Sequence, residues 1–395
     1  MTNFLISGAS IAGTTTAYWL RRHGFDVTVV ERAPSIREGG YKVDIRGAAL
    51  DVVERMGILD EVRARRTGMT TATYYDGKGK KVAAIDADLF GGREGPDEEI
   101  MRGDLNEILY ELTRHDTEYL FDDSITAIAE DGTVTFEKAA PRRFDVVIGA
   151  DGAHSNTRRL VFGDESKFAR HLGAYISIST VPNHLGLERE EAVHAAPGRT
   201  ANVYSTRQDG TAKALFIWSG PEAPYDHRDV AGQKAMLTET MAGAGWVVPE
   251  LLMSVRAADD FYFDSVSQIH MDSWSSGRIV LVGDAGYCAS PASGQGTSLA
   301  LVGAYVLALE LARADGDLAA AFAAYEREMR PFVAANQALG PANLRGMVLP
   351  SRFMVWFQLT MMKLLPHLPG KDRTIERITG PIREAASAIT LKPVE

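Results

Sequence analysis

The stretch NFLISGASIAGTTTAYWLRRHGFDVTVVER, residues 3–32, decides the fold of the chain. Its apolar start predicts a short buried strand, its middle predicts a helix, and the β-branched run DVTVVE predicts a second strand. Gly24 stands where glycine commonly ends a helix. This order predicts a βαβ unit, which places the chain in the α/β class with a Rossmann-like domain at its N-terminus.

The turn of this unit has the spacing of a dinucleotide-binding motif. Gly8 permits the tight turn and Gly13 permits close packing of helix on strand, while Ser10 takes the middle position, where backbone approaches a pyrophosphate. Glu31 ends the second strand, where an acid accepts a hydrogen bond from a ribose hydroxyl. We therefore expect a bound dinucleotide; the alternative is a glycine-rich turn without a ligand.

A second small-residue loop occurs late in the chain, within VGDAGYCASPASGQGTSLALV, residues 282–302. Asp284 follows a predicted strand, and so lies at the carboxyl edge of a sheet, where α/β folds bind ligands. The loop then leads into a helix whose free N–H groups attract negative charge. We expect a cradle for a planar, partly anionic ring, and the alternative is a flexible connector.

Two further motifs carry polar groups at the ends of predicted elements. Asp151 and Gly152 follow a buried strand, and Arg102 precedes a helix with Leu105 and Leu109 on its apolar face. Taken alone, the first is a turn and the second an ordinary surface arginine.

Composition excludes several classes of protein. The chain has 395 residues, 45% hydrophobic and 24% charged, as in globular proteins. Its net charge of −10 argues against nucleic acid as a partner. The single cysteine, Cys288, permits no internal disulfide, and the nine histidines show no metal spacing. We expect a cytoplasmic protein without a metal, as a monomer or a homodimer.

No segment is long and apolar enough to predict a membrane span. The best candidate, Phe353 to Leu365, is short and contains Gln358 and Lys363. It predicts a core or capping helix, and a helix lying on a membrane surface is the less favoured alternative.

The domain organisation follows from where the strand pattern changes. Buried parallel-type strands give way to alternating, antiparallel-type strands and then return, before a mostly helical end. We expect a discontinuous nucleotide-binding domain, an inserted β-rich substrate domain and a C-terminal helical segment. Their ranges are, in that order, 1–73 with 97–165 and 272–335; 74–96 with 166–271; and 336–395.

Together the four motifs resemble the single-component FAD-dependent aromatic hydroxylases of the para-hydroxybenzoate hydroxylase type. The resemblance covers about residues 3–335, and length and layout are similar to the tetracycline-inactivating monooxygenase branch. Three positions depart from that pattern: Ser10 replaces a glycine, Tyr287 a histidine and Gly303 an aspartate.

The resemblance implies a site for non-covalently bound FAD. It assigns the ADP half to the first turn and second strand, the extended chain to Arg102 and Asp284, and the ring to the late loop. More weakly, it assigns Arg37 to NADPH. The implied FAD-binding residues are Gly8, Ser10, Ile11, Ala12, Gly13, Glu31, Arg32, Asp44, Arg46, Arg102, Asp151, Gly283, Asp284, Pro291, Gly294, Gln295, Gly296, Thr297 and Ser298.

The resemblance also implies the chemistry. NADPH or NADH reduces FAD, and O₂ then forms a flavin C4a-hydroperoxide that hydroxylates an aromatic, polyketide or antibiotic-like small molecule. No side chain is expected to act as a catalytic residue, although Arg46 and Pro291 are expected near the ring. Tyr204, Phe216 and Trp218 are candidate walls of the substrate pocket, and packing in a sheet core is the equal alternative for each.

Three other functions stay open at this stage. A flavin-dependent reductase or a halogenase-like enzyme would use the same cofactor, but no two of the five tryptophans have the W-x-W spacing of halogenases. A flavin-binding protein without turnover would keep the motifs and lack the reaction. A dehydrogenase with bound NAD would be colourless.

Overall fold

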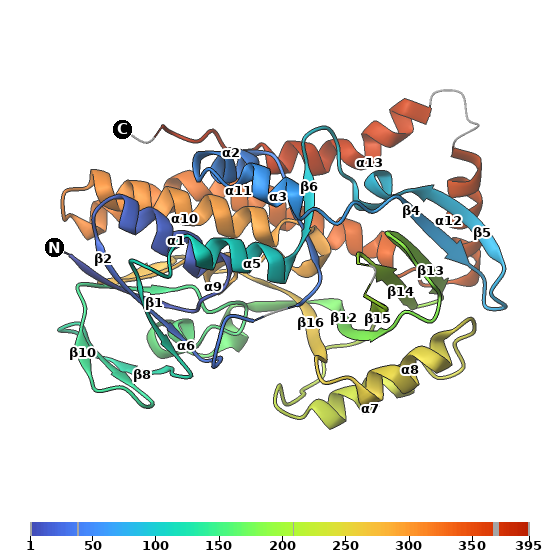
Figure 1. Cartoon of the computed structure of the whole chain (residues 1–395), viewed down its shortest axis with the longest axis horizontal. Coiled ribbons are helices and arrows are strands. Elements are labelled where there is room, and N and C mark those ends of the chain that lie inside the picture. Colours follow the sequence, from blue (N-terminus) through green and yellow to red (C-terminus); the bar gives the residue numbers. More distant parts are fainter. Residues whose placement is uncertain (1, 38, 208, 366–370, 394–395) are drawn as a thin grey trace.

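A computed structural model describes residues 2–37, 39–207, 209–365 and 371–393 of the chain (Figure 1). The predicted βαβ unit is present as β1 (Asn3–Ser7), α1 (Ile11–Arg22) and β2 (Asp26–Glu31). It forms the centre of a six-stranded sheet of order β17-β18-β11-β1-β2-β7, parallel except for the edge strand β17. The added strands are β7 (Glu118–Phe121), β11 (Val146–Gly149), β17 (Ser275–Ser276) and β18 (Ile279–Leu281).

Helices cover this sheet. The most buried is α10 (Gly296–Arg313), which packs against α1. By length and composition α10 could cross a membrane, but 83% of it is buried inside the protein, as expected of a core helix. The others are α2 (Ala48–Arg55), α3 (Leu59–Ala64), α5 (Arg102–Glu111), α6 (Asn156–Phe162) and the short α9 (Asp284–Tyr287).

Two small sheets complete this half of the molecule. One has the order β10-β9-β8, from β8 (Ile125–Ile128), β9 (Thr133–Phe136) and β10 (Arg142–Arg143). The other pairs β3 (Lys42–Ile45) with β6 (Glu98–Met101). This second pair matters for the site, since both of its strands carry charged side chains into the cavity described below.

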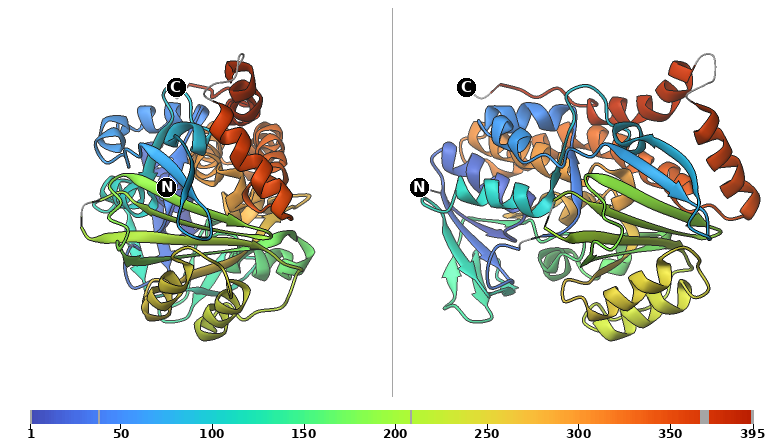
Figure 2. Two further views of the ribbon diagram at one scale, coloured as in Figure 1. Left: turned by 90° about the vertical axis from the view of Figure 1, so that its right-hand side faces the viewer. Right: turned by 45° about the vertical axis from the view of Figure 1, so that its right-hand side comes forward.

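A seven-stranded sheet forms the other half, in the order β16-β12-β15-β14-β13-β4-β5. It unites the two predicted β-rich segments in one sheet, although β4 begins at Thr71, slightly before the predicted boundary. Two helices, α7 (Val230–Thr240) and α8 (Val248–Ala257), lie against one face (Figure 2). The strands are β4 (Thr71–Tyr75), β5 (Lys81–Asp86), β12 (Ala169–Pro182), β13 (Glu190–Ala196), β14 (Arg199–Ser205), β15 (Thr211–Ser219) and β16 (Tyr262–Ile269), and a short helix, α4 (Ala87–Gly91), follows β5.

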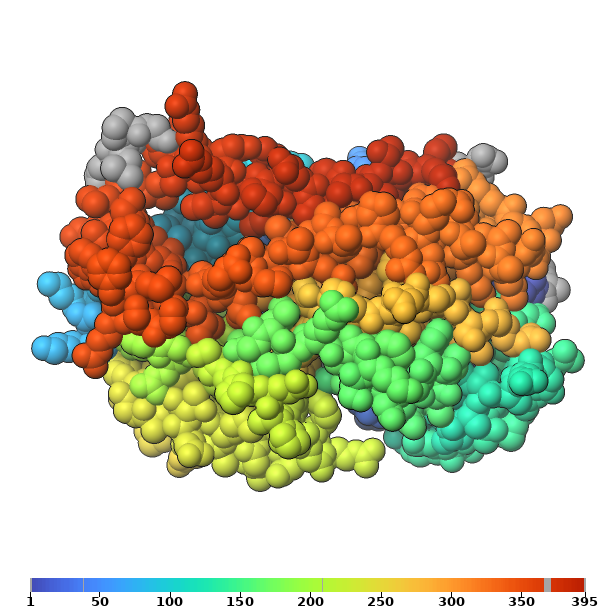
Figure 3. Space-filling view, turned by 180° about the vertical axis from the view of Figure 1, so that it is seen from behind, coloured from blue at the N-terminus to red at the C-terminus, as the bar shows by residue number. Residues whose placement is uncertain are grey.

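Helices end the chain, as predicted. The 30-residue α11 (Leu318–Met347) continues through Pro331 and Pro341, so it crosses the predicted domain boundary at residue 336 without a break. It is followed by α12 (Arg352–Leu364) and α13 (Lys371–Ala386). The orange-red surface of α12 forms one end of the molecule (Figure 3).

The long helix α11 also supports the late loop from behind. Gln337 Nε2 donates to the carbonyl oxygen of Cys288 at 3.4 Å, and Asn343 Nδ2 donates to that of Ala292 at 3.1 Å. One helix therefore holds the late loop and leads directly into the C-terminal helices.

Candidate cofactor and substrate site

A cavity of about 1510 Å³ runs from the first turn of the chain to the seven-stranded sheet. Its volume exceeds the roughly 300–1,000 Å³ typical of a pocket for one small molecule. The first turn, the late loop, the β3–β6 pair and the seven-stranded sheet all contribute to its wall. The cavity therefore has room for a dinucleotide and a second molecule.

The glycines of the first turn are required by backbone contacts. Gly8 has a φ of +106°, and a Cβ there would lie 2.6 Å from the carbonyl oxygen of Ala150. A Cβ at Gly13 would lie 1.8 Å from the carbonyl oxygen of Gly8. These contacts leave no space for a side chain, which explains why the motif has glycine at both positions.

Glu31 lies at one end of the cavity and is held by the backbone. Its Oε2 accepts from the amide of Ala9 at 2.9 Å, and its Oε1 accepts from that of Ala33 at 2.8 Å. A carboxylate has about four lone-pair positions, so acceptor capacity remains for a ribose hydroxyl. Arg37 Nη2 lies 3.7 Å from the same Oε1, so Arg37 lies at this end of the cavity, and its assignment to NADPH stays a prediction.

Arg102 and Ser10 meet at the start of α1. The hydroxyl of Ser10 makes no capping bond to the helix, and instead accepts from Arg102 Nη2 at 2.8 Å. The guanidinium thus lies close to the N-terminus of α1, and its charge adds to the partial positive charge of that helix end. A pyrophosphate is the group that fits this combination.

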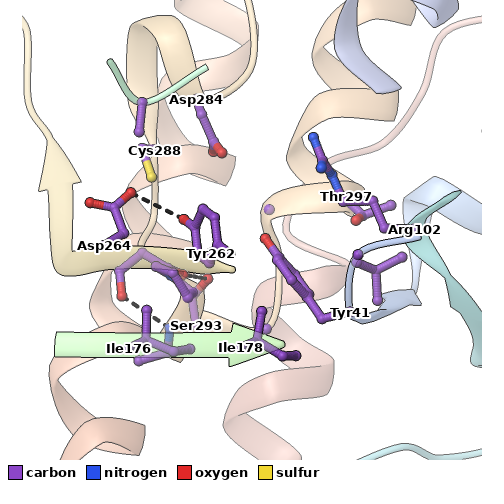
Figure 4. A pocket seen from close by; sticks show the side chains of 18 of the residues that line it. Tyr41, Arg102, Ile176, Ile178, Tyr262, Asp264, Asp284, Cys288, Ser293 and Thr297 are labelled. Atoms are coloured by element: carbon purple, nitrogen blue, oxygen red, sulfur yellow. Dashed lines mark hydrogen bonds between the residues drawn. The ribbon is translucent and has the colours of Figure 1, made fainter. Parts of the chain in front are cut away.

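The first part of the late loop lies across the cavity from Arg102 (Figure 4). Figure 4 shows Asp284 and Cys288 on one side of the opening and Arg102, Tyr41 and Thr297 on the other. Burial raises the pKa of Asp284, with Arg102 opposing that shift.

The loop forms an open cradle at the start of α10. Gly294 has a φ of +67°, and the nearest heavy atom to a Cβ at Gly296 would be Asp284 Oδ1, at 3.9 Å. A side chain at Gly296 would therefore enter the space that the resemblance reserves for the ring. The residues present thus fit FAD: those at the start of α1 would hold its phosphates, and those at the start of α10 would hold its ring.

The structure places most predicted site residues on the cavity wall. Asp151 lies there too, but its carboxylate is engaged by the protein, since it accepts from the amide and hydroxyl of Thr157 at 2.8 and 2.9 Å. Four of the predicted FAD-binding residues do not line the cavity, namely Gly13, Gly283, Gln295 and Ser298. Those on it are Gly8, Ser10, Ile11, Ala12, Glu31, Arg32, Arg37, Asp44, Arg46, Arg102, Asp151, Tyr204, Asp284, Pro291, Gly294, Gly296 and Thr297.

Arg46 is buried, and its side chain has structural partners. It donates to the carbonyl oxygens of Gly91 and Gly92, both at 2.7 Å, and to Asp44 Oδ2 at 2.8 Å. Burial alone would raise the pKa of Asp44, but Arg46 and Arg93 outweigh it and the net shift is downward. Arg46 therefore fastens the β3 strand to the end of α4.

A chain of alternating charges continues from Asp44 along the cavity. Arg93 Nη1 lies 3.3 Å from Asp44 and 2.5 Å from Glu99, and Lys42 Nζ lies 3.3 Å from Glu99 and also pairs with Glu191. Sequence reasoning missed this network, although the charged alternation of YKVDIRG was a signal for part of it.

The prediction that Phe216 and Trp218 wall the substrate pocket was wrong. Both belong to β15 and share a face, but that face packs on the apolar side chains of α7 and α8. Side chains alternate along a strand, so Leu215 and Ile217 face the cavity instead. Tyr204 does line the cavity, and its hydroxyl accepts from the amide of Lys42 at 3.2 Å.

Sequence reasoning also missed a cluster around His154 and Asp264, which lies near Asp284 and Cys288 of the late loop (Figure 4). His154 Nε2 lies 3.1 Å from both carboxylate oxygens of Asp264, and its Nδ1 lies 2.9 Å from Glu165. Burial would lower the pKa of His154, but these two carboxylates raise it to about 10. Asp264 also accepts from Tyr262, whose ring faces the cavity (Figure 4). His154, His227 and Asp264 are close enough to hold a metal ion, yet Asp264 already has these partners.

Comparisons with known proteins agree with this geometry. The family described as the FAD binding domain matches residues 1–338. A flavin-dependent monooxygenase of an unknown prokaryotic organism is 44% identical over 339 residues, covering 85% of this chain and 88% of that protein. An uncharacterized protein of Mycobacterium tuberculosis is 49% identical over 351 residues, covering 88% and 94%.

A solved structure extends the likeness to the whole chain. The crystal structure of tetracycline destructase Tet(51) superposes with a TM-score of 0.86 at 34% identity, covering 100% of both chains. The cradle, the acid at the end of β2 and these similarities lead to one conclusion. This chain belongs to the FAD binding domain family and is an FAD-dependent enzyme of the flavin monooxygenase type.

Proposed function

We propose that the enzyme uses NADPH or NADH and O₂ to hydroxylate an uncharged, polycyclic aromatic or polyketide-like molecule. Bound FAD would supply the activation of O₂. The chain's own residues would orient the cofactor, exclude water and place the substrate.

The lining of the substrate half of the cavity carries this proposal. Its wall is built from apolar and aromatic side chains of the seven-stranded sheet and nearby segments, among them Tyr74, Ile85, Phe90, Ile178, Leu215 and Ile217. Four cations on that wall, Lys42, Arg46, Arg93 and Lys213, are each paired with a carboxylate, and a further one, Arg377, is an exposed side chain of α13. A small carboxylated phenol would need a cation of its own there, whereas a neutral ring system would not.

Similarity to proteins named tetracycline destructases also supports a substrate with several fused rings. Because the volume exceeds that of a one-ligand pocket, a multi-ring substrate fits beside the cofactor.

The test is NAD(P)H oxidation by the FAD-loaded protein with three sets of compounds: tetracyclines, anthraquinone-type polyketides and small phenolic acids. We expect a multi-ring compound to accelerate oxidation and to gain one oxygen by mass spectrometry. Acceleration only by phenolic acids would overturn the substrate class. A product that gains two hydrogens would indicate a reductase, and hydrogen peroxide equal to the NAD(P)H consumed with every compound would overturn the hydroxylation.

A further inference from the structure

The helix α12 has two apolar faces, whereas a helix at a protein surface usually has one. Its inner face, with Leu359 and Met362, packs against a cluster on the seven-stranded sheet that includes Tyr74. Its outer face carries Phe353, Trp356 and Phe357, which are 67%, 60% and 53% exposed. The predicted capping role explains the inner face and leaves the outer face without an explanation.

The exposed side chains form a continuous stripe. At 3.6 residues per turn, Phe353, Phe357 and Leu364 project to one side, with Trp356 beside them. Met354, Met361 and Leu364 are also exposed, at 42%, 36% and 44%. Such a concentration of large apolar side chains marks a surface that contacts something else.

The charge of this segment is opposite to that of the chain. Residues 329–371 contain five Lys or Arg and no Asp or Glu, in a chain of net charge −10. Arg352 and Lys363 lie on α12 beside Trp356, and neither has a carboxylate partner in the described parts of the chain. An apolar face bordered by unpaired cations is the pattern of a helix at an anionic lipid surface.

We propose that α12 docks the enzyme on the surface of a bilayer that contains anionic lipids. Phe353, Trp356 and Phe357 would enter the headgroup boundary while Arg352 and Lys363 contact lipid phosphates. A second copy of the chain fits less well, because a symmetric contact would bring two such basic segments together.

Vesicle flotation with the full FAD-loaded chain tests the proposal. The vesicles are phosphatidylcholine alone and a 3:1 mixture with phosphatidylglycerol. We expect at least tenfold more protein on the mixed vesicles, and a large loss of binding in 0.5 M salt. Trp356 is the most exposed of the five tryptophans, so its emission is expected to shift to the blue on binding.

Two variants and a control make the result decisive. The triple variant Phe353→Ser, Trp356→Ser, Phe357→Ser and the double variant Arg352→Glu, Lys363→Glu are each expected to lose binding while retaining FAD. Met253→Ser removes an equally exposed apolar side chain from α8 and is expected to bind like the wild type.

Three outcomes would overturn the proposal. These are absence of wild-type binding to either vesicle, equal binding by the triple variant, and sedimentation of the wild type as a dimer that only the triple variant dissociates. The last would assign the face to a second copy.

Discussion

Two departures from the family pattern, Tyr287 and Gly303, pack against each other. A Cβ at Gly303 would lie 2.0 Å from the hydroxyl oxygen of Tyr287, so the tyrosine requires the glycine. That hydroxyl lies 2.8 Å from Tyr325 Oη, which donates to the carbonyl oxygen of Leu281 at 3.2 Å. The sequence could show both departures, but only the structure shows that they touch.

The pair predicts a coupling between two substitutions. We expect Gly303→Ala to lower the free energy of unfolding by about 1–3 kcal/mol, because an added methyl overpacks the core. Tyr287→Phe alone is expected to lower the free energy of unfolding by about 1 kcal/mol, because the hydroxyl is lost. In that background, Gly303→Ala is expected to lower the free energy of unfolding by less than half of what it does in the wild type. Urea denaturation of the four proteins measures this, and additive effects would contradict the contact.

A second prediction concerns the cradle. Gly296 has an ordinary helical conformation and open space at its Cβ position, so Gly296→Val is expected to fold. It is expected to lose FAD, or to release hydrogen peroxide in place of product if FAD stays. FAD content and the peroxide-to-product ratio are the measurements. Gly346→Val, at a helical position with open space in α11 where the cavity meets the seven-stranded sheet, is the control and is expected to keep FAD. Unchanged FAD content and coupling in Gly296→Val would show that the loop is a connector.

A third prediction concerns the phosphates. We expect Arg102→Ala to weaken FAD binding by about 1.5–3 kcal/mol, or about 10- to 150-fold, because a charge-assisted contact is lost. Arg63→Ala removes an arginine that pairs with Glu98 outside the cavity and is expected to leave the affinity unchanged. Titration of stripped protein with FAD distinguishes them, and equal affinities would remove Arg102 from the site.

At the scale of elements, the sequence pattern predicted the helices and strands better than it predicted which side chains line the cavity. The βαβ unit, the carboxyl-edge position of Asp284 and the helix after the late loop follow from local signals, and all are present. The alternation of β15 predicts that Phe216 and Trp218 share a face, but not which face the helices α7 and α8 cover. That choice depends on packing between distant segments, as does the network of Lys42, Arg93 and Glu99.

His154 ties two elements together in a way that depends on pH. It joins Asp264 on β16 to Glu165, which follows α6, and its pKa rises from 6.5 to about 10. The contact therefore stabilises the fold fully below about pH 6.5, and its contribution is lost as the pH rises through 10. We expect the wild type to lose stability relative to His154→Gln across this range. Thermal melts of both proteins from pH 6 to 10.5 check this, and parallel curves would contradict it.

At the scale of the whole molecule, the site is assembled from segments far apart in the chain. The first turn, the β3–β6 pair, the late loop and the seven-stranded sheet enclose a single cavity, and two side chains of α12, Gln358 and Met362, reach its wall. A motif can predict each fragment of such a site, whereas the depth and polarity of the enclosed space arise only when the two halves meet.

The long helix α11 has a consequence for how events at the two ends of the enzyme communicate. It contacts the late loop through hydrogen bonds from Gln337 to Cys288 and from Asn343 to Ala292, and it continues towards α12. A ligand that reduces local opening of the late loop should therefore also reduce local opening of α12, because α11 links the two by contact. We expect FAD to slow backbone amide hydrogen exchange in α12 as well as in residues 284–298. Protection confined to those loop residues would show that α11 does not couple the two ends, and protection in both would make α12 a reporter of cofactor binding.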